Sequence, residues 1–94
     1  MRALRFHAAP NTLGRTRLGL SIPKRVGTNV KRNHIKRLLR DAFRLNQHTL
    51  PAGLDVIVGV NPHATQTLDA YATAMQAALQ SLAATWKSRA DKAP

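Results

Sequence analysis

Two short segments near the N-terminus alternate between apolar and polar side chains. In the first, Arg2–Ala8, three apolar residues share one face: Leu4, Phe6 and Ala8. The second, Arg17–Ile22, alternates in the same way. A period of two predicts β-strands, and the proline, asparagine and glycine between them predict a loop. We therefore expect the two strands to pair as an antiparallel hairpin.

The apolar positions change to a helical period after Pro23. Thr28 or Asn29 suits the N-cap of a helix that continues to Asn46. With Ile35 at the centre and about 100° per residue, one face of this helix is apolar and is expected to face the core: Leu38, Leu39, Ala42, Phe43 and Leu45.

The second half of the chain predicts a buried strand and a long helix. Asp55–Val60 is β-branched and apolar on both faces, which is typical of an interior strand. Thr65 or Thr67 can cap a helix whose periodic apolar residues would face the core: Leu68, Tyr71, Ala72, Met75, Leu79, Leu82 and Trp86. The order β-β-α-β-α over residues 1–94 predicts a single domain, an α/β sandwich in which a small mixed sheet packs against helices.

The charge of the chain indicates what kind of partner the protein binds. The sequence has 15 Lys and Arg against four acidic residues, a net charge of +11, and 12 of the 15 cations lie before residue 46. Such a charge opposes folding by self-repulsion unless a polyanion neutralises it, and nucleic acid is the expected polyanion. An acidic membrane surface is the alternative, but no lipidation motif and no apolar run of about 18 residues is present. The absence of cysteine excludes disulfides, Cys-ligated zinc and a Cys nucleophile.

Basic residues gather on the helix face opposite the apolar one. We call this acid-free set the basic stripe: Asn33, Lys36, Arg37, Arg40 and Arg44. An ordinary solvated face is one interpretation, but such faces usually mix signs, with Glu and Lys paired at i,i+4. Unpaired cations favour phosphate contacts, for which Arg supplies forked donors. The Asn33 amide suits a base edge or a 2′-hydroxyl, with a local turn bond as the alternative.

Three further cations lie beside the stripe. Arg32 flanks it near the helix start, and Lys24 and Arg25 precede the helix, where they extend the same patch or serve loop solubility.

The stretch RLGLSIPKRVGTNVKRNHIKRLLRDAFR, Arg17–Arg44, resembles the central block of the bacterial ribonuclease P protein subunit. DVIVGV and the last helix resemble that family more loosely. The resemblance implies the ribosomal protein S5 domain 2-like fold, with a left-handed β-α-β crossover. It also implies a protein that pairs with a catalytic RNA to remove the 5′ leader of precursor tRNA. The family also has a basic helix before its first strand; because this sequence starts almost directly in that strand, we do not expect that helix here.

The resemblance also implies roles for individual residues. Five positions match the family's RNA-contact helix: Arg32, Asn33, Lys36, Arg37 and Arg40. Lys24 and Arg25 match the basic pair after its strand. Phe6 falls where the family has an aromatic residue facing the leader, which suits base stacking, although its alternation with Leu4 favours a core position. Ser21, on the other strand face from Leu20, is a further candidate for leader contact.

The residues do not predict chemistry by the protein itself. The four aspartates are scattered, and the histidines show no metal-site or triad-like spacing. We expect no cofactor on the protein, Mg²⁺ held by the RNA of the holoenzyme, and a cytoplasmic location. The expected partners are the ribonuclease P RNA and precursor tRNA, without DNA or membrane. A ribosomal or ribosome-assembly protein is the alternative that composition alone leaves open.

Overall fold

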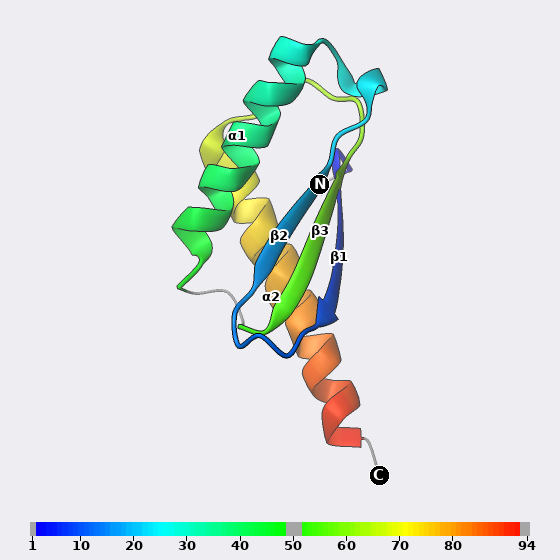
Figure 1. Cartoon of the computed structure of the whole chain (residues 1–94), viewed down its shortest axis with the longest axis vertical. Helices are drawn as coiled ribbons and strands as arrows, with labels where there is room; N and C mark the ends of the chain where they lie inside the picture. Colours follow the sequence, from blue (N-terminus) through cyan, green and yellow to red (C-terminus); the bar gives the residue numbers. More distant parts are fainter. Residues whose placement is uncertain (1, 49–51, 93–94) are drawn as a thin grey trace.

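The computed structural model describes residues 2–48 and 52–92. Its elements follow the predicted order: β1 (Leu4–Pro10), β2 (Arg17–Ser21), a 3-10 turn η1 (Lys24–Val26), α1 (Asn29–Asn46), β3 (Leu54–Val60) and α2 (Leu68–Lys92). Figure 1 shows the three strands side by side with both helices packed against them. The predicted α/β sandwich of order β-β-α-β-α is confirmed. The side chain of Trp86, predicted for the core stripe, lies outside the described residues.

Strand β3 lies at the centre of a three-stranded sheet of order β1-β3-β2. β1 pairs with it antiparallel, with Phe6 opposite Val58, and β2 pairs with it parallel, with Leu20 opposite Val58. The predicted hairpin of β1 with β2 is therefore wrong. A strand that is apolar on both faces is best placed in the middle, where neighbours on both sides satisfy its backbone groups and cover its side chains.

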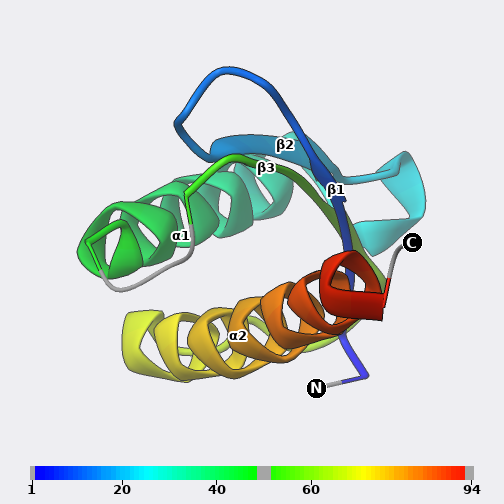
Figure 2. The same cartoon turned by 90° about the horizontal axis from the view of Figure 1, so that it is seen from below.

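The connection from β2 through α1 to β3 joins parallel neighbours. In Figure 1, β2 and β3 both run upward and α1 returns downward, and Figure 2 shows that both helices lie on a single face of the sheet. Followed through both views, this crossover is left-handed. Such crossovers are rare among β-α-β units, and the family resemblance implied this one.

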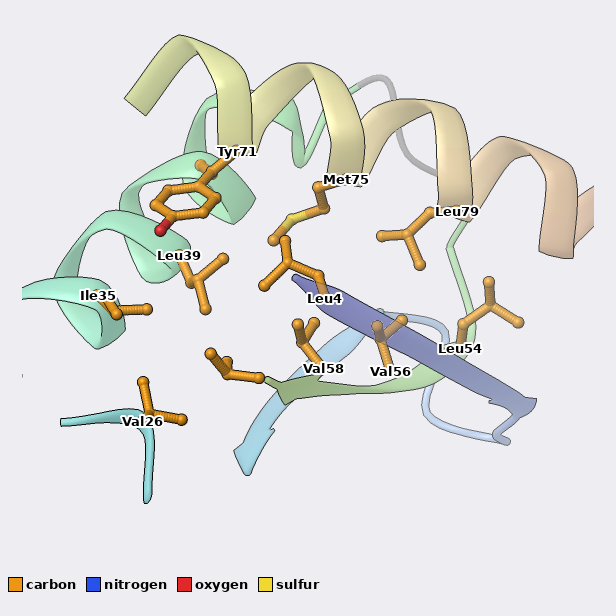
Figure 3. Close-up of a cluster of buried hydrophobic side chains, with 12 residues drawn as sticks. Leu4, Val26, Ile35, Leu39, Leu54, Val56, Val58, Tyr71, Met75 and Leu79 are labelled. Atoms are coloured by element: carbon orange, nitrogen blue, oxygen red, sulfur yellow. The ribbon is translucent and has the colours of Figure 1, made fainter. Parts of the chain in front are cut away.

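The hydrophobic core fills the space between the sheet and the two helices. From α2, Tyr71, Met75 and Leu79 are fully buried. Met75 and Leu79 face β3, whereas the Tyr71 ring lies toward Ile35 and Leu39 of α1 (Figure 3). The other elements complete the cluster with Leu4, Val26, Ile35, Leu39, Ala42, Leu54 and Val60. The opposite face of the sheet carries no helix among the described residues (Figure 2), which leaves it open.

Helix α1 has the predicted bounds, and its ends explain them. At its start, the Thr28 hydroxyl accepts a hydrogen bond from the backbone N–H of Lys31 at 3.2 Å, so Thr28 is the N-cap. At its end, Leu45 is 62% exposed and the prediction that it faces the core is wrong. Asn46 is buried instead, since it projects only about 20° from Ile35 whereas Leu45 projects about 80°. The side-chain amide of Asn46 donates to the carbonyl oxygen of Ala72 at 2.9 Å, which joins α1 to α2.

The loop between β3 and α2 is held by a hydrogen-bonded network around the buried Tyr71 hydroxyl. That hydroxyl lies 2.7 Å from Nε2 of His63 and accepts the backbone N–H of Gln66 at 3.1 Å. Nδ1 of His63 lies 2.8 Å from the carbonyl oxygen of Asn61, so Nδ1 carries the proton and Nε2 accepts from Tyr71. Lys31 donates to the carbonyl of His63 at 2.7 Å. The network therefore ties the first turns of α1 to the start of α2.

Candidate nucleic-acid interface

The basic stripe of α1 is exposed along its whole length. Each of its members presents its side chain to solvent: Asn33, Lys36, Arg37, Arg40 and Arg44. Ile35 and Leu39, on the other side of the helix, are fully buried and hold α1 against the sheet and α2. Because residues three and four apart are neighbours on a helix, the cations from Lys36 to Arg44 form a continuous row about 12 Å long. A rigid helix thus presents several cations at set spacing, as predicted.

One prediction about this stripe is wrong. Arg44 donates a hydrogen bond to the carboxylate of Asp41, three residues before it, so the stripe is not free of carboxylate partners. The side chain of Arg44 is 72% exposed, and such exposed pairs contribute about 0–1 kcal/mol. A phosphate can therefore replace this carboxylate at little cost.

Lys24 and Arg25 lie in η1, where both are exposed. The turn is anchored by Val26, which is 3% exposed and belongs to the core, and by a bond from its N–H to the carbonyl of Pro23. Figure 1 places η1 and the first turn of α1 at the same end of the molecule. These two cations therefore extend the basic surface beyond the start of the stripe.

A small hollow lies between the end of β2 and the first half of α1. Its volume is about 190 Å³, and it is lined by Leu20, Ile22, Arg32, Asn33 and Lys36. Arg32 is half-buried there and donates to the side chain of Asn29, one turn earlier. The helical pattern indicated the three polar residues. Leu20 and Ile22 were not predicted to line a site, because the alternation of β2 marked them only as core residues.

The open face of the sheet carries a second set of side chains. The register places His7, Gly19 and Ile57 beside one another across all three strands, and Ile57 is 52% exposed. Arg5 lies over Gly59, where an added Cβ would come within 3.4 Å of its guanidinium. This face combines an apolar centre with cations. No local pattern in the sequence indicates it, because it depends on strand order.

The two residues predicted to contact the leader lie on opposite faces of the sheet. Ser21 is exposed at the end of β2, and its register partner is Gly59, so it belongs to the open face. Phe6 shares the face of its partner Val58, and it is half-buried against the core beneath the helices. The structure thus places Phe6 as a core-packed side chain of an edge strand.

An ion pair closes one end of the open face. Oδ1 of Asp55 accepts from Nε of Arg17 at 2.7 Å and from the amide of Asn11 at 2.9 Å, and Oδ2 accepts from Arg17 at 2.8 Å. The hydrogen bonds from Arg17 and Asn11 lower the pKa of Asp55 to about 2, because they stabilise its charged form. Through Asn11, this carboxylate holds the β1–β2 loop against β3, and Arg17 compensates its negative charge.

Among residues 2–48 and 52–92, no three His or Asp side chains are grouped as metal ligands. Within the same ranges, neither helix has the length and apolar character needed to cross a bilayer.

Comparison with known protein sequences identifies a family. The sequence model described as Ribonuclease P matches residues 1–86. The "Ribonuclease P protein component" of Photobacterium profundum is 50% identical over 52 residues, which cover 54% of this chain and 44% of that protein. The protein of the same name from Chlamydia abortus is 42% identical over 59 residues, covering 62% of this chain and 42% of that protein. The matched segments thus span less than half the length of these relatives.

Comparison with solved structures points to the same family as the sequence comparison. The RNase P protein of Staphylococcus aureus has a TM-score of 0.72 and 26% identity, covering 88% of this chain and 76% of that one. The RNase P protein of Thermotoga maritima has a TM-score of 0.60 and 29% identity, covering 62% and 53%. These comparisons give no support to the ribosomal alternative. With its left-handed crossover and its match over residues 1–86, this chain belongs to the Ribonuclease P family of proteins.

Proposed function

We propose that this chain acts as the protein subunit of a ribonuclease P, and that its α1 stripe binds the catalytic RNA. The observation that carries the proposal is the exposed row Lys36–Arg40–Arg44, with Arg37 beside it, on a helix anchored by a buried face. Guanidinium groups pair with phosphate oxygens through two parallel bonds, and each neutralised phosphate releases counterions. Membership in the Ribonuclease P family supports an RNA as the polyanion.

The 5′ leader of precursor tRNA is the proposed substrate segment of the open sheet face. Single strands bind where an apolar surface receives bases and nearby cations track the backbone. Ile57 provides the exposed apolar centre, and Arg5, His7 and Ser21 surround it on the same face. Phe6 would reach the single-stranded leader only from the edge of β1, so we assign it a weaker contact with the leader than the residues of the open face.

The RNA and the protein have separate roles in this proposal. The RNA binds the Mg²⁺ ions and carries out phosphodiester cleavage, and the protein screens phosphate repulsion and positions the leader. The protein works where the RNA and precursor tRNA are found, in the cytoplasm. DNA and membranes are not partners in this proposal.

The test is reconstitution with a bacterial ribonuclease P RNA and a precursor tRNA at low Mg²⁺. The protein should stimulate 5′ maturation, because added cations replace part of the screening that Mg²⁺ supplies. Cleavage by the protein alone, or no stimulation at any Mg²⁺ concentration, would contradict the proposal.

Charge removal tests the surface itself. Arg37→Ala and Arg40→Ala should each weaken RNA binding and reduce the slope of log K against log salt by about one unit, since each variant neutralises one phosphate fewer. Arg15→Ala is the matched control, because Arg15 is an exposed cation of the β1–β2 loop and should leave the slope unchanged. Equal slopes for all three variants and the unmodified protein would move the RNA-binding surface away from α1.

A further inference from the structure

We propose that the hollow between β2 and α1 is a binding site for one unpaired base of an RNA. This inference rests on the proposed RNA-binding function and deepens it, since it assigns a defined base-binding site to a surface proposed above to bind the phosphates of the RNA backbone. The hollow is lined by Leu20, Ile22, Arg32, Asn33 and Lys36.

The lining differs in kind from the rest of the basic stripe. Leu20 and Ile22 are half-buried and leave part of their apolar surface in the hollow. A phosphate gains nothing from an apolar floor, whereas the face of a base does, because stacking and apolar contact remove it from water. Arg37 and Arg40 do not line this hollow and suit the RNA backbone. The apolar part of the lining, Leu20 and Ile22, therefore favours a base over a phosphate alone.

The size of the hollow limits what can enter. Its volume of about 190 Å³ is below the range of roughly 300–1,000 Å³ of pockets for drug-sized ligands. One planar ring system is a suitable occupant, and a base pair is too large. In an A-form duplex the bases are stacked and their edges lie in grooves, so only an unpaired, splayed-out nucleotide can offer a base to this site.

The polar rim supplies hydrogen bonds at the edge of such a base. Arg32 is held in place by its bond to Asn29, and its Nε is shielded from solvent and has no hydrogen-bond partner among the described residues. After a small rotation of the Arg32 side chain, this Nε can donate a hydrogen bond to an acceptor atom of an entering base. The guanidinium plane also suits stacking on a base.

Asn33 and Lys36 complete the site. The Asn33 amide can both donate and accept, which suits the Watson–Crick edge of a base. Lys36 lies one turn from Arg32 on the same side of the helix, at i,i+4, where its ammonium can meet the phosphate of the same nucleotide. The three side chains thus cover edge, plane and phosphate of a single nucleotide.

The experiment compares two RNA hairpins of equal length and charge, one fully paired and one with a single bulged 2-aminopurine. Binding of the full chain is followed by anisotropy at several salt concentrations, and the 2-aminopurine emission reports stacking. We expect the bulged hairpin to bind about tenfold more tightly, the effect of one stacked base, with quenched emission.

Two variants change the hollow and one changes only charge. Ile22→Phe fills the hollow, and Asn33→Ala removes the edge contact at an exposed position where the fold does not depend on it. Both should abolish the tenfold preference and the quenching while the salt slope stays the same. Arg37→Ala should weaken both hairpins equally and lower the slope by about one unit, with the preference retained.

The outcomes separate this inference from the proposed function. Equal binding of both hairpins by the unmodified protein, with a steep salt slope, would overturn the base site and leave the RNA-binding stripe intact. A preference that survives in Asn33→Ala and in folded Ile22→Phe would also overturn it. No binding of either hairpin would contradict the proposed function itself.

Discussion

The buried hydroxyl of Tyr71 should make a measurable contribution to stability, and Tyr71→Phe tests it. The substitution keeps the ring, which is fully buried, and removes only the oxygen. Two hydrogen bonds disappear: the one to Nε2 of His63 at 2.7 Å and the one from the backbone N–H of Gln66 at 3.1 Å. The phenyl ring fills the same space, so no cavity adds to the loss.

The magnitude follows from the surroundings of the two orphaned groups. A hydrogen bond contributes about 0.5–1.5 kcal/mol net, and more is lost when its partner stays buried without water. Both His63 and the Gln66 N–H are only partly buried in these bonds, so water can replace the hydroxyl in part. We therefore expect a loss of about 2 kcal/mol, which lowers the melting temperature by roughly 8–16 °C for a domain of this size.

The assay is urea unfolding followed by circular dichroism, with the free energy of unfolding taken from linear extrapolation. Gln66→Ala is the control, because it removes an exposed side chain that bonds only to the carbonyl of Ala64 at 3.2 Å and keeps the backbone N–H. It should change the free energy by less than about 0.5 kcal/mol. A Tyr71→Phe variant as stable as the unmodified protein would refute the view that this network holds the β3–α2 loop.

Three further substitutions test the rest of the fold. The pKa of Asp55 is lowered to about 2 in the folded protein, so its bond to Arg17 stabilises the fold fully above the unfolded pKa of about 3.9 and is lost as pH falls through about 2. The urea midpoint of Asp55→Asn should therefore approach that of the unmodified protein only in this acid range. A difference between the two midpoints that does not change with pH would contradict this. Leu39→Ala should cost about 2–5 kcal/mol in urea unfolding, whereas Leu45→Ala, at an exposed position of the same helix, should cost less than about 0.5 kcal/mol, and similar costs would mean that the core is misplaced. Thr28→Ala should cost about 1 kcal/mol through loss of the N-cap, with Thr28→Ser restoring most of it in thermal melts.

Local patterns in the sequence predicted the elements well. The bounds of α1 could be read from the helical period and the candidate caps Thr28 and Asn29, and the structure shows that Thr28 is the N-cap. The stripe Tyr71, Met75 and Leu79 was also predicted correctly, because a period of 3.6 over a long segment has few alternatives. These are properties of short-range geometry, which each residue shares with neighbours three or four positions away.

What the sequence did not predict depends on distant partners. The hairpin prediction failed because β3, which follows α1 in the chain, inserts between β1 and β2. Asn46 is buried because the carbonyl of Ala72 on α2 satisfies its amide. The hydrogen bond from Lys31 to the carbonyl of His63 likewise joins residues that are 32 positions apart. The hollow beside β2 also needed the packing of α1 on the sheet, which no local pattern encodes.

The central place of β3 has a consequence for the order in which this protein is made. A ribosome releases β1, β2 and α1 before the strand on which both β1 and β2 depend. Until residues 54–60 emerge, the sheet cannot form, and the segment already synthesised carries 12 of the 15 cations. Folding then requires contacts between residues far apart in the chain, which makes it slow for a small domain. A nascent chain of this kind is a polycation without a core, and an RNA that binds only its folded form would draw it toward that form by mass action.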